Sequence, residues 1–288
     1  MKNCTIMYHN IWGWNESETN PTPLRNRYLF DSYLTYRPEI LCLQEVTRMM
    51  RFNGEFPIIA KLCENGYAEA EVEPYKEKYY TATPILYRTD VFKLTDKGVY
   101  KFGTVEGAPD EGSGGADKFI TWAVLERIES GELLGVVSVH LAYQRGEEGE
   151  AFRLSQVPLV LETAKNIAEK YSCPVIVGGD MNCNQLSKPY AAYLEGGLSD
   201  VFDYFPKDGE GRNPNCDDYT SHYGYPVFNT EKGVFERHQT IPARKYWEAI
   251  DHIFYLGDKL NFHYFKIVKD TDALLGSDHA PLLIEVDI

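Results

Sequence analysis

The stretch VIVGGDMN, residues 175–182, places two glycines and then Asp180 and Asn182 directly after an apolar run. In an extended backbone, side chains two positions apart point the same way, so Asp180 and Asn182 are expected to reach one target. Gly178 and Gly179 would let another group approach the backbone closely. The alternative is an Asx turn that leaves the strand, because Asp and Asn often form such turns.

Similar short apolar segments recur along the chain and predict strands. They are residues 4–11, 40–43, 85–87, 119–128, 133–141, 175–177, 250–256 and 282–286. Several are nearly continuous in Val, Ile and Leu, which favours strands that are covered on both faces. The pair 119–128 and 133–141 predicts a hairpin, because a short polar segment with one glycine joins them. Residues 24–37 and 151–171 have helical spacing instead, so the pattern predicts a layered α/β fold with mixed strands.

Length and composition are typical of one globular domain over residues 1–288, since 43% of the chain is hydrophobic. A net charge of -14 argues against a broad basic surface that could bind duplex DNA. The six cysteines form no CxxC pair, and most lie in or beside apolar runs, as reduced cysteines do. The sequence contains no apolar run of membrane-spanning length. We therefore expect a cytoplasmic protein without stable membrane insertion, and we infer no obligate protein partner.

Almost every predicted strand is bordered by an acid, an amide or a histidine. These residues are Asn10, Glu45, His140, Asp180, Asn182, Asp251, Asp278 and His279. Each has an ordinary explanation when taken alone, such as a loop carboxylate or a buried histidine with its hydrogen bonds satisfied. Carboxylates that converge at one end of a core would repel one another unless a cation offsets their charge. Oxygen and amide ligands without a cysteine cluster favour Mg²⁺ or Mn²⁺ over Zn²⁺.

Asp251 is the hardest of these residues to explain structurally, because it lies in an otherwise apolar strand. A buried carboxylate is unfavourable by several kcal/mol unless it is paired. The doublet Asp278 and His279 precedes another buried strand and supplies a candidate partner. We expect a carboxylate from one strand to orient an imidazole from the other.

The order of LQEV, VHL, GGDMN, IDHIFY and SDHAPL resembles the endonuclease/exonuclease/phosphatase superfamily of DNase I-like phosphoesterases. The resemblance runs from Asn10 to the last predicted strand. It implies a four-layer α/β/β/α sandwich of two packed mixed β-sheets flanked by helices, with the site at one end of the sheets. It also implies that Glu45 is the main metal ligand, with Asn10 beside it and Asp278 assisting.

The same resemblance implies a division of catalytic roles. Asp180 would deprotonate the attacking water, and Asn182 would hold that water or the phosphoryl oxygens. His140 and His279 would bind phosphate oxygens, and Asp251 would bond to the His279 ring. One departure is Trp12, because abasic-site endonucleases usually carry an acidic residue two positions after the asparagine. This difference weakens a function in DNA repair.

Substrate recognition is less clearly encoded. Residues 220–248 are rich in aromatic side chains and include Trp247 near several cations, so they predict either a substrate-recognition loop or an ordinary packed loop. Arg88 and Arg145 are further candidates for contact with phosphate, although most arginines are simply surface charges.

The function that the sequence favours is metal-dependent hydrolysis of a phosphate mono- or diester on a small molecule, a sugar or a lipid headgroup. The alternative is an Mg²⁺-dependent nuclease that acts on DNA or RNA. A catalytically inactive binding module would be expected to have lost some of these residues. A glycosidase with two carboxylates would not require the amide and the two histidines beside them.

Overall fold

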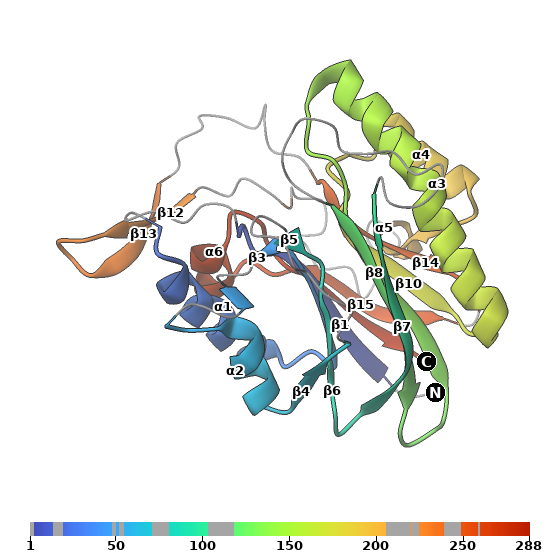
Figure 1. Ribbon diagram of the computed structural model, residues 1–288, viewed down its shortest axis with the longest axis horizontal. Helices are drawn as coiled ribbons and strands as arrows, with labels where there is room; N and C mark the ends of the chain where they lie inside the picture. Colours follow the sequence, from blue (N-terminus) through green and yellow to red (C-terminus); the bar gives the residue numbers. More distant parts are fainter. Residues whose placement is uncertain are drawn as a thin grey trace.

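Two six-stranded β-sheets lie face to face, and helices cover the outer face of each (Figure 1). The computed structural model describes residues 3–13, 20–47, 50–51, 55–70, 81–102, 118–205, 220, 225–238, 249–258 and 260–288. Each sheet is mixed, because it contains one parallel pair of strands among antiparallel pairs. This arrangement confirms the four-layer sandwich that the resemblance implied.

The first sheet contains both ends of the described chain. Its order is β15 (Asn261–Ile267), β16 (Leu282–Asp287), β1 (Asn3–Asn10), β2 (Ile40–Gln44), β6 (Ile85–Arg88) and β4 (Tyr67–Glu69). Strands β1 and β2 are its parallel pair. Helices α1 (Thr22–Tyr36), α2 (Ile58–Glu64) and α6 (Thr271–Gly276) lie on its outer side (Figure 1).

The second sheet is built mainly from the middle of the chain. Its order is β11 (Ser199–Asp200), β14 (Asp251–Leu256), β10 (Val175–Asp180), β9 (Leu133–His140), β8 (Phe119–Arg127) and β7 (Phe92–Lys101). Strands β9 and β10 are its parallel pair. Helices α3 (Gly146–Tyr171) and α4 (Lys188–Glu195) cover its outer face, and the short helix α5 (Val201–Tyr204) follows β11 (Figure 1).

Alternation along the strands divides the apolar residues into three cores. In β1, Ile6 and Tyr8 face the second sheet, whereas Met7 packs toward the helices of the first sheet. In β10, Ile176 faces the first sheet, and Val177 belongs to the core under α3 and α4. One core therefore lies between the sheets and one lies under each helical layer, as period-2 alternation in a doubly covered strand requires.

All eight predicted strands are present, including the antiparallel pair β8 and β9. The edge strands β7 and β15 were not predicted, because exposed positions interrupt their apolar pattern. The second predicted helix begins earlier than expected, at Gly146, and contains Pro158. Residues 220–248 include a β-hairpin of β12 (Tyr225–Asn229) and β13 (Val234–His238), which lies beside α6 (Figure 1).

Two further features concern the short elements and the thiols. Strands β3 (Val46–Thr47) and β5 (Thr81–Ala82) form a small separate ladder just after β2. Among the cysteines in the described part of the chain, Cys4, Cys42, Cys173 and Cys183 are buried thiols and Cys63 is exposed. None of the helices in the described residues combines the length and the apolarity needed to cross a bilayer.

Candidate functional site

Strand direction brings the predicted polar residues to one end of the two sheets. Strands β1, β2, β9 and β10 end there, whereas β8, β14 and β16 run antiparallel to their neighbours and begin there. His140 and Asp251 flank Asp180 in the ladder, because Asp180 pairs with both. By the same alternation that buries Tyr8, Asn10 faces the space between the sheets. Residues far apart in the sequence therefore form one buried polar cluster.

Asp180 lies at the centre of this cluster. The amide nitrogen of Asn10 donates to Asp180 Oδ2 at 2.8 Å and to Glu45 Oε1 at 3.1 Å. His140 Nε2 lies 3.5 Å from Asp180 Oδ2 and 3.8 Å from Glu45 Oε1. One ligand atom each from Glu45, His140 and Asp180 could reach a single ion, since these atoms lie within 4.8 Å of one another.

Asp251 and His279 form the pair that the sequence predicted. His279 Nδ1 lies 2.9 Å from Asp251 Oδ2, and the hydroxyl of Thr220 donates to the same oxygen at 2.6 Å. The other ring nitrogen, His279 Nε2, lies 3.9 Å from Asp180 Oδ2. Burial alone would lower the pKa of His279, but the charges of Asp251, Asp278 and Asp180 outweigh it and raise that pKa well above its usual range. The geometry therefore orients a cationic imidazole toward Asp180.

The buried carboxyls of this cluster lack sufficient positive charge. Burial and then the charge of Asp251 raise the pKa of Asp180 to about 7. Burial and then the charge of Glu45 raise the pKa of Asp278 to about 6. Asp278 Oδ1 is buried and accepts no hydrogen bond from the described residues. An oxygen-rich cluster with an unsatisfied carboxylate oxygen fits a hard divalent cation, for which Glu45, Asp278 and the amide oxygen of Asn10 are the candidate ligands.

The backbone at Asn182 decides between the extended segment and the Asx turn that the sequence left open. Strand β10 ends at Asp180, and Asn182 has a φ of 49°. Its backbone N–H donates to Asp180 Oδ1 at 2.9 Å, so the two residues form an Asx-type turn. The side-chain amide of Asn182 donates to Leu141 O at 3.1 Å. Of the two interpretations of the sequence, the Asx turn is therefore the one that the structure has, because this local hydrogen bond turns the chain.

The two glycines before Asp180 serve packing within the protein. A Cβ at Gly178 would lie 2.8 Å from the Tyr8 ring, and one at Gly179 would lie 2.1 Å from Val139 O. Gly179 also has a φ of 133°, which few other residues adopt. The close approach predicted at these positions is therefore made by the core and by the neighbouring strand.

Left-handed backbone is concentrated at this end of the sheets. Of the non-glycine residues with positive φ in the described ranges, Arg37 and Ser172 are helix C-caps. The other three are Trp12, Glu45 and Asn182, which follow β1, β2 and β10. Such a conformation is unfavourable for these residues and persists only where surrounding contacts hold it, as often occurs at functional sites.

Several supporting residues were not singled out from the sequence. The guanidinium of Arg25 is fully buried and donates to the carbonyls of Ile11, Trp12 and Gly276. The hydroxyl of Ser277 donates to Asn10 O at 2.7 Å. These bonds fix the turns after β1 and α6. A charged residue in a helix usually indicates a solvent-exposed face, so the sequence held no signal for the burial of Arg25.

His9 is a further supporting residue that the sequence analysis missed. Burial lowers the pKa of His9 to about 3, so the ring is neutral. Its Nε2 lies 3.1 Å from His279 O and therefore donates to that carbonyl. Its Nδ1 accepts from the Tyr33 hydroxyl at 2.7 Å. His9 thereby connects α1 to the backbone of His279.

Lys118 is the largest omission, because it directly contacts a predicted site residue. Its ammonium nitrogen lies 2.5 Å from His140 Nε2 and 3.0 Å from His140 Nδ1. Lys118 immediately precedes β8, which begins at the end of the sheet where β9 finishes. A search for polar residues at the starts of antiparallel strands would have found it.

Of the three predicted substrate-binding residues, Arg88 lies away from the cluster. Strand β6 runs antiparallel to β2, so Arg88 lies beside the start of β2, at the opposite end from Glu45. Its guanidinium pairs with Asp90. This position argues against contact between Arg88 and a phosphate held at the cluster. Arg145 is exposed at the N-cap of α3, and Trp247 lies outside the described residues.

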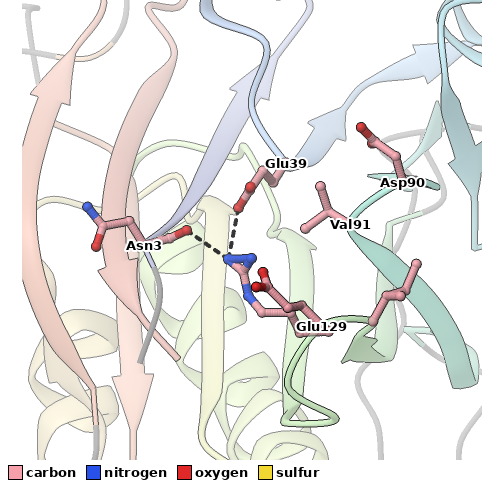
Figure 2. A pocket seen from close by; sticks show the side chains of 7 residues that line it. Asn3, Glu39, Asp90, Val91 and Glu129 are labelled. Carbon is pink, nitrogen blue, oxygen red and sulfur yellow. Dashed lines mark hydrogen bonds and ion pairs between the residues drawn. The ribbon is translucent and has the colours of Figure 1, made fainter.

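A surface cavity marks the end of the sheets where Arg88 lies. Its volume is about 490 Å³, and it is lined by Asn3, Glu39, Asp90, Val91, Arg127, Ile128 and Glu129. The Arg127 guanidinium donates to Asn3 O at 2.7 Å and to Glu39 Oε2 at 3.2 Å (Figure 2). The Arg127 guanidinium thus makes two of its hydrogen bonds within the protein. Because Asn3 and Glu39 lie at the starts of β1 and β2, the cavity is at the end of the sheets opposite the polar cluster.

Comparisons with known proteins agree with the fold. The model of the endonuclease/exonuclease/phosphatase family matches residues 7–279. Nocturnin of Xenopus laevis is 26% identical over 196 residues, which cover 66% of this chain and 48% of that protein, so the match spans about half of the relative. The solved endonuclease/exonuclease/phosphatase of Bacteroides vulgatus has a TM-score of 0.76 at 21% identity and covers 100% of both chains. The mannosyl-6-phosphatase of Bacteroides thetaiotaomicron has a TM-score of 0.69 at 19% identity and covers 99% of this chain and 100% of its own.

Proposed function

The chain belongs to the endonuclease/exonuclease/phosphatase family, whose members are metal-dependent phosphoester hydrolases, and on that premise we propose a specific reaction for it. The proposed reaction is hydrolysis of a phosphate mono- or diester on a small molecule, a sugar or a lipid headgroup. Water attacks the phosphorus, Asp180 accepts its proton, and the P–O ester bond breaks, so that the leaving oxygen takes up a proton and departs as the alcohol. The observation that carries this proposal is the convergence of Asn10, Glu45, His140, Asp251 and His279 around Asp180.

Asp180 is the proposed general base because Asn10, His140 and His279 all lie close to its carboxylate. Its Oδ2 accepts from Asn10 and lies near the ring nitrogens of His140 and His279. Its Oδ1 accepts the N–H of Asn182, which fixes the orientation of the carboxyl plane. A base held on both oxygens is oriented before the substrate arrives, which favours proton transfer in one geometry.

The two histidines are the proposed donors to the phosphoryl oxygens. Asp251 holds His279 through Nδ1, so Nε2 is the nitrogen directed toward the cluster. In phosphoryl transfer the protein mainly positions the reactants and stabilises developing negative charge. A cationic imidazole serves that role directly. Asn182 would hold the water or a phosphoryl oxygen through its side-chain amide, which bonds to Leu141 O.

Glu45, Asn10 and Asp278 are the proposed metal ligands, and Mg²⁺ or Mn²⁺ is the proposed ion. A divalent cation, when bound, supplies positive charge that stabilises the phosphoryl oxygens during the reaction. Glu45 is the most accessible of the three, with its side chain 15% exposed. The buried Asp278 would contribute the oxygen that lacks a hydrogen-bond donor among the described residues.

A small substrate is favoured over a polynucleotide by charge. The chain carries a net charge of -14, so long-range attraction of a nucleic-acid backbone is weak. The mannosyl-6-phosphatase shows that the same fold serves, by its name, a sugar phosphate. We therefore place sugar and other small-molecule phosphates ahead of DNA or RNA.

The test begins with metal-stripped protein and restores Mg²⁺, Mn²⁺ or Ca²⁺ separately. The substrates are p-nitrophenyl phosphate, bis-p-nitrophenyl phosphate, a panel of sugar phosphates, and single-stranded oligonucleotides of DNA and RNA. Metal-dependent release of product from the small esters supports the proposal. Cleavage of oligonucleotides alone would support the nuclease instead, and no cleavage under any metal would contradict both.

A further inference from the structure

A buried lysine at the rim of the cluster has no role in the reaction proposed above. Lys118 is 2% exposed and directly precedes β8. Its ammonium lies 2.5 Å from His140 Nε2, which is the nitrogen that faces Asp180 and Glu45. The ammonium also lies 5.6 Å from the centroid of the Tyr143 ring, and Tyr143 is 50% exposed. Lys118 therefore lies between His140 of the cluster and the exposed ring of Tyr143.

The charge of Lys118 reaches the reacting groups. Burial is the main reason that the pKa of His140 lies well below its usual range, and the Lys118 charge is the next. The ammonium therefore lies beside a neutral imidazole, whose Nδ1, 3.0 Å from Lys118 Nζ, can accept from it while Nε2 keeps the hydrogen that faces the cluster. The pKa of Asp180 is raised overall, but Lys118 is among the charges that oppose the rise. Burying an ammonium is unfavourable by several kcal/mol unless nearby negative charge compensates, and the cluster supplies that charge.

The positive charge of Lys118 matters most for a phosphate monoester, which carries more negative charge than a diester. It brings together Glu45, Asp180, Asp251 and Asp278, so an anionic substrate meets strong repulsion. A phosphate diester carries one negative charge, whereas a monoester carries nearly two at neutral pH. Coulomb energy scales with the product of the charges, so a fixed cation stabilises the monoester about twice as strongly as the diester at the same distance.

We propose that Lys118 is a specificity-determining residue that selects phosphate monoesters over diesters by contributing its charge beside His140. The inference rests on the proposed hydrolytic function and names its substrate class. The ammonium contacts a terminal phosphoryl oxygen that a diester would have esterified, and the exposed Tyr143 ring borders the entrance beside it. The preferred substrate is then a small molecule with a terminal phosphate group.

The test compares Lys118→Met, Lys118→Gln and Lys118→Arg with wild type on p-nitrophenyl phosphate and bis-p-nitrophenyl phosphate. Loss of a charge-assisted contact is expected to lower kcat/KM for the monoester by about 100-fold. The diester should lose about 10-fold, because it carries half the charge. The ratio of monoester to diester activity should thus fall about 10-fold in the Met variant.

The other variants separate charge from hydrogen bonding. Lys118→Gln keeps a donor for His140 without the charge, so its ratio should match that of Lys118→Met. Lys118→Arg keeps the charge and should retain most of the wild-type ratio, and it also remains informative if the Met variant fails to fold. Lys170→Met is the matched control, because Lys170 is 65% exposed and pairs with Asp96 away from the cluster. That control should leave both activities unchanged.

The failures of the two proposals are distinguishable. If wild-type protein cleaves neither ester with any metal, the hydrolytic proposal is wrong. If wild type is active but prefers the diester, or if Lys118→Met lowers both activities by the same factor, the hydrolase stands and the selection of monoesters is overturned. Restoration of the wild-type ratio by Lys118→Gln would likewise assign Lys118 to the orientation of His140 instead.

Discussion

Replacing Asp251 with Asn should remove charge from the site while preserving its shape. The Asn side chain can still accept from His279 Nδ1, which lies 2.9 Å from Asp251 Oδ2, and from the Thr220 hydroxyl at 2.6 Å. What is lost is the nearest counterion of a buried imidazole. At an effective dielectric constant of about 20, that attraction is on the order of 5 kcal/mol.

The carboxylates of Asp180 and Asp278 compensate only part of the attraction that His279 loses. Asp180 Oδ2 and Asp278 Oδ1 each lie 3.9 Å from His279 Nε2. Because about 1.4 kcal/mol corresponds to a tenfold change in a protonation equilibrium, the cationic form of His279 should become at least about 100-fold less favoured. The pKa of His279 falls as a result, so the cationic ring proposed to stabilise the phosphoryl oxygens is less populated. We expect kcat to fall by about 100- to 10,000-fold with little change in metal affinity.

A second buried Asp–His pair in the same sheet provides the control. His252 follows Asp251 in β14 but faces the opposite side, where its Nδ1 lies 3.5 Å from Asp200 Oδ2. Both Asp200→Asn and Asp251→Asn should lower the free energy of unfolding, by about 1–3 kcal/mol each. Steady-state kinetics and urea denaturation measure the two effects separately. Equal losses of kcat in the two variants, or a normal kcat in Asp251→Asn, would refute the role assigned to the Asp251–His279 pair.

Three further predictions concern the metal, the pH dependence and the packing under the site. Glu45→Gln keeps the side-chain length but removes the charge of the main proposed ligand, so calorimetry should show metal affinity at least about 100-fold weaker; unchanged affinity would exclude Glu45 as that ligand. The pKa values of Asp180 and Asp278 are raised from 3.8 to about 7 and about 6, so their contribution to stability is complete below the unfolded value and is lost as the pH rises through the folded values. The Tm of metal-free protein should therefore fall between about pH 4 and pH 7, and less so in Asp278→Asn, whereas a rising Tm would contradict this account. Gly178→Ala places a methyl group 2.8 Å from the buried Tyr8 ring, so urea denaturation should show a loss of about 1–3 kcal/mol, and an unchanged midpoint would mean that the ring moves aside easily.

The sequence predicts the interior of this fold well because the interior strands are covered on both faces. Strands β1, β9 and β10 contain few exposed positions, so their apolar runs are nearly continuous. The edge strand β7 has exposed Lys93 and Lys97, which interrupt that signal. Its register also shifts between Leu94 and Asp96. An edge strand is defined by its place in the sheet, which local sequence does not encode.

The sequence pattern found polar residues at the ends of strands but left open the direction in which each strand runs. The ends of the parallel strands β1, β2, β9 and β10 meet at one edge, so Asn10, Glu45, His140 and Asp180 converge there. Arg88 also follows an apolar run, but β6 is antiparallel to β2 and ends at the opposite edge. Lys118 directly precedes β8, and a lysine beside a strand usually indicates a surface charge. Pairing direction depends on contacts between distant segments, and that information was missing from the local pattern.

The account depends most directly on Asp180 as the group that activates water. The measurement is turnover of p-nitrophenyl phosphate by wild type and Asp180→Asn, with metal affinity determined by calorimetry on the same samples. The Asn side chain keeps one oxygen, which can accept from the N–H of Asn182, and loses the bond that Asn10 donates to Asp180 Oδ2. Folding and metal binding should persist while turnover falls by at least about 100-fold. Near-normal turnover of the metal-loaded Asp180→Asn variant would contradict the central claim.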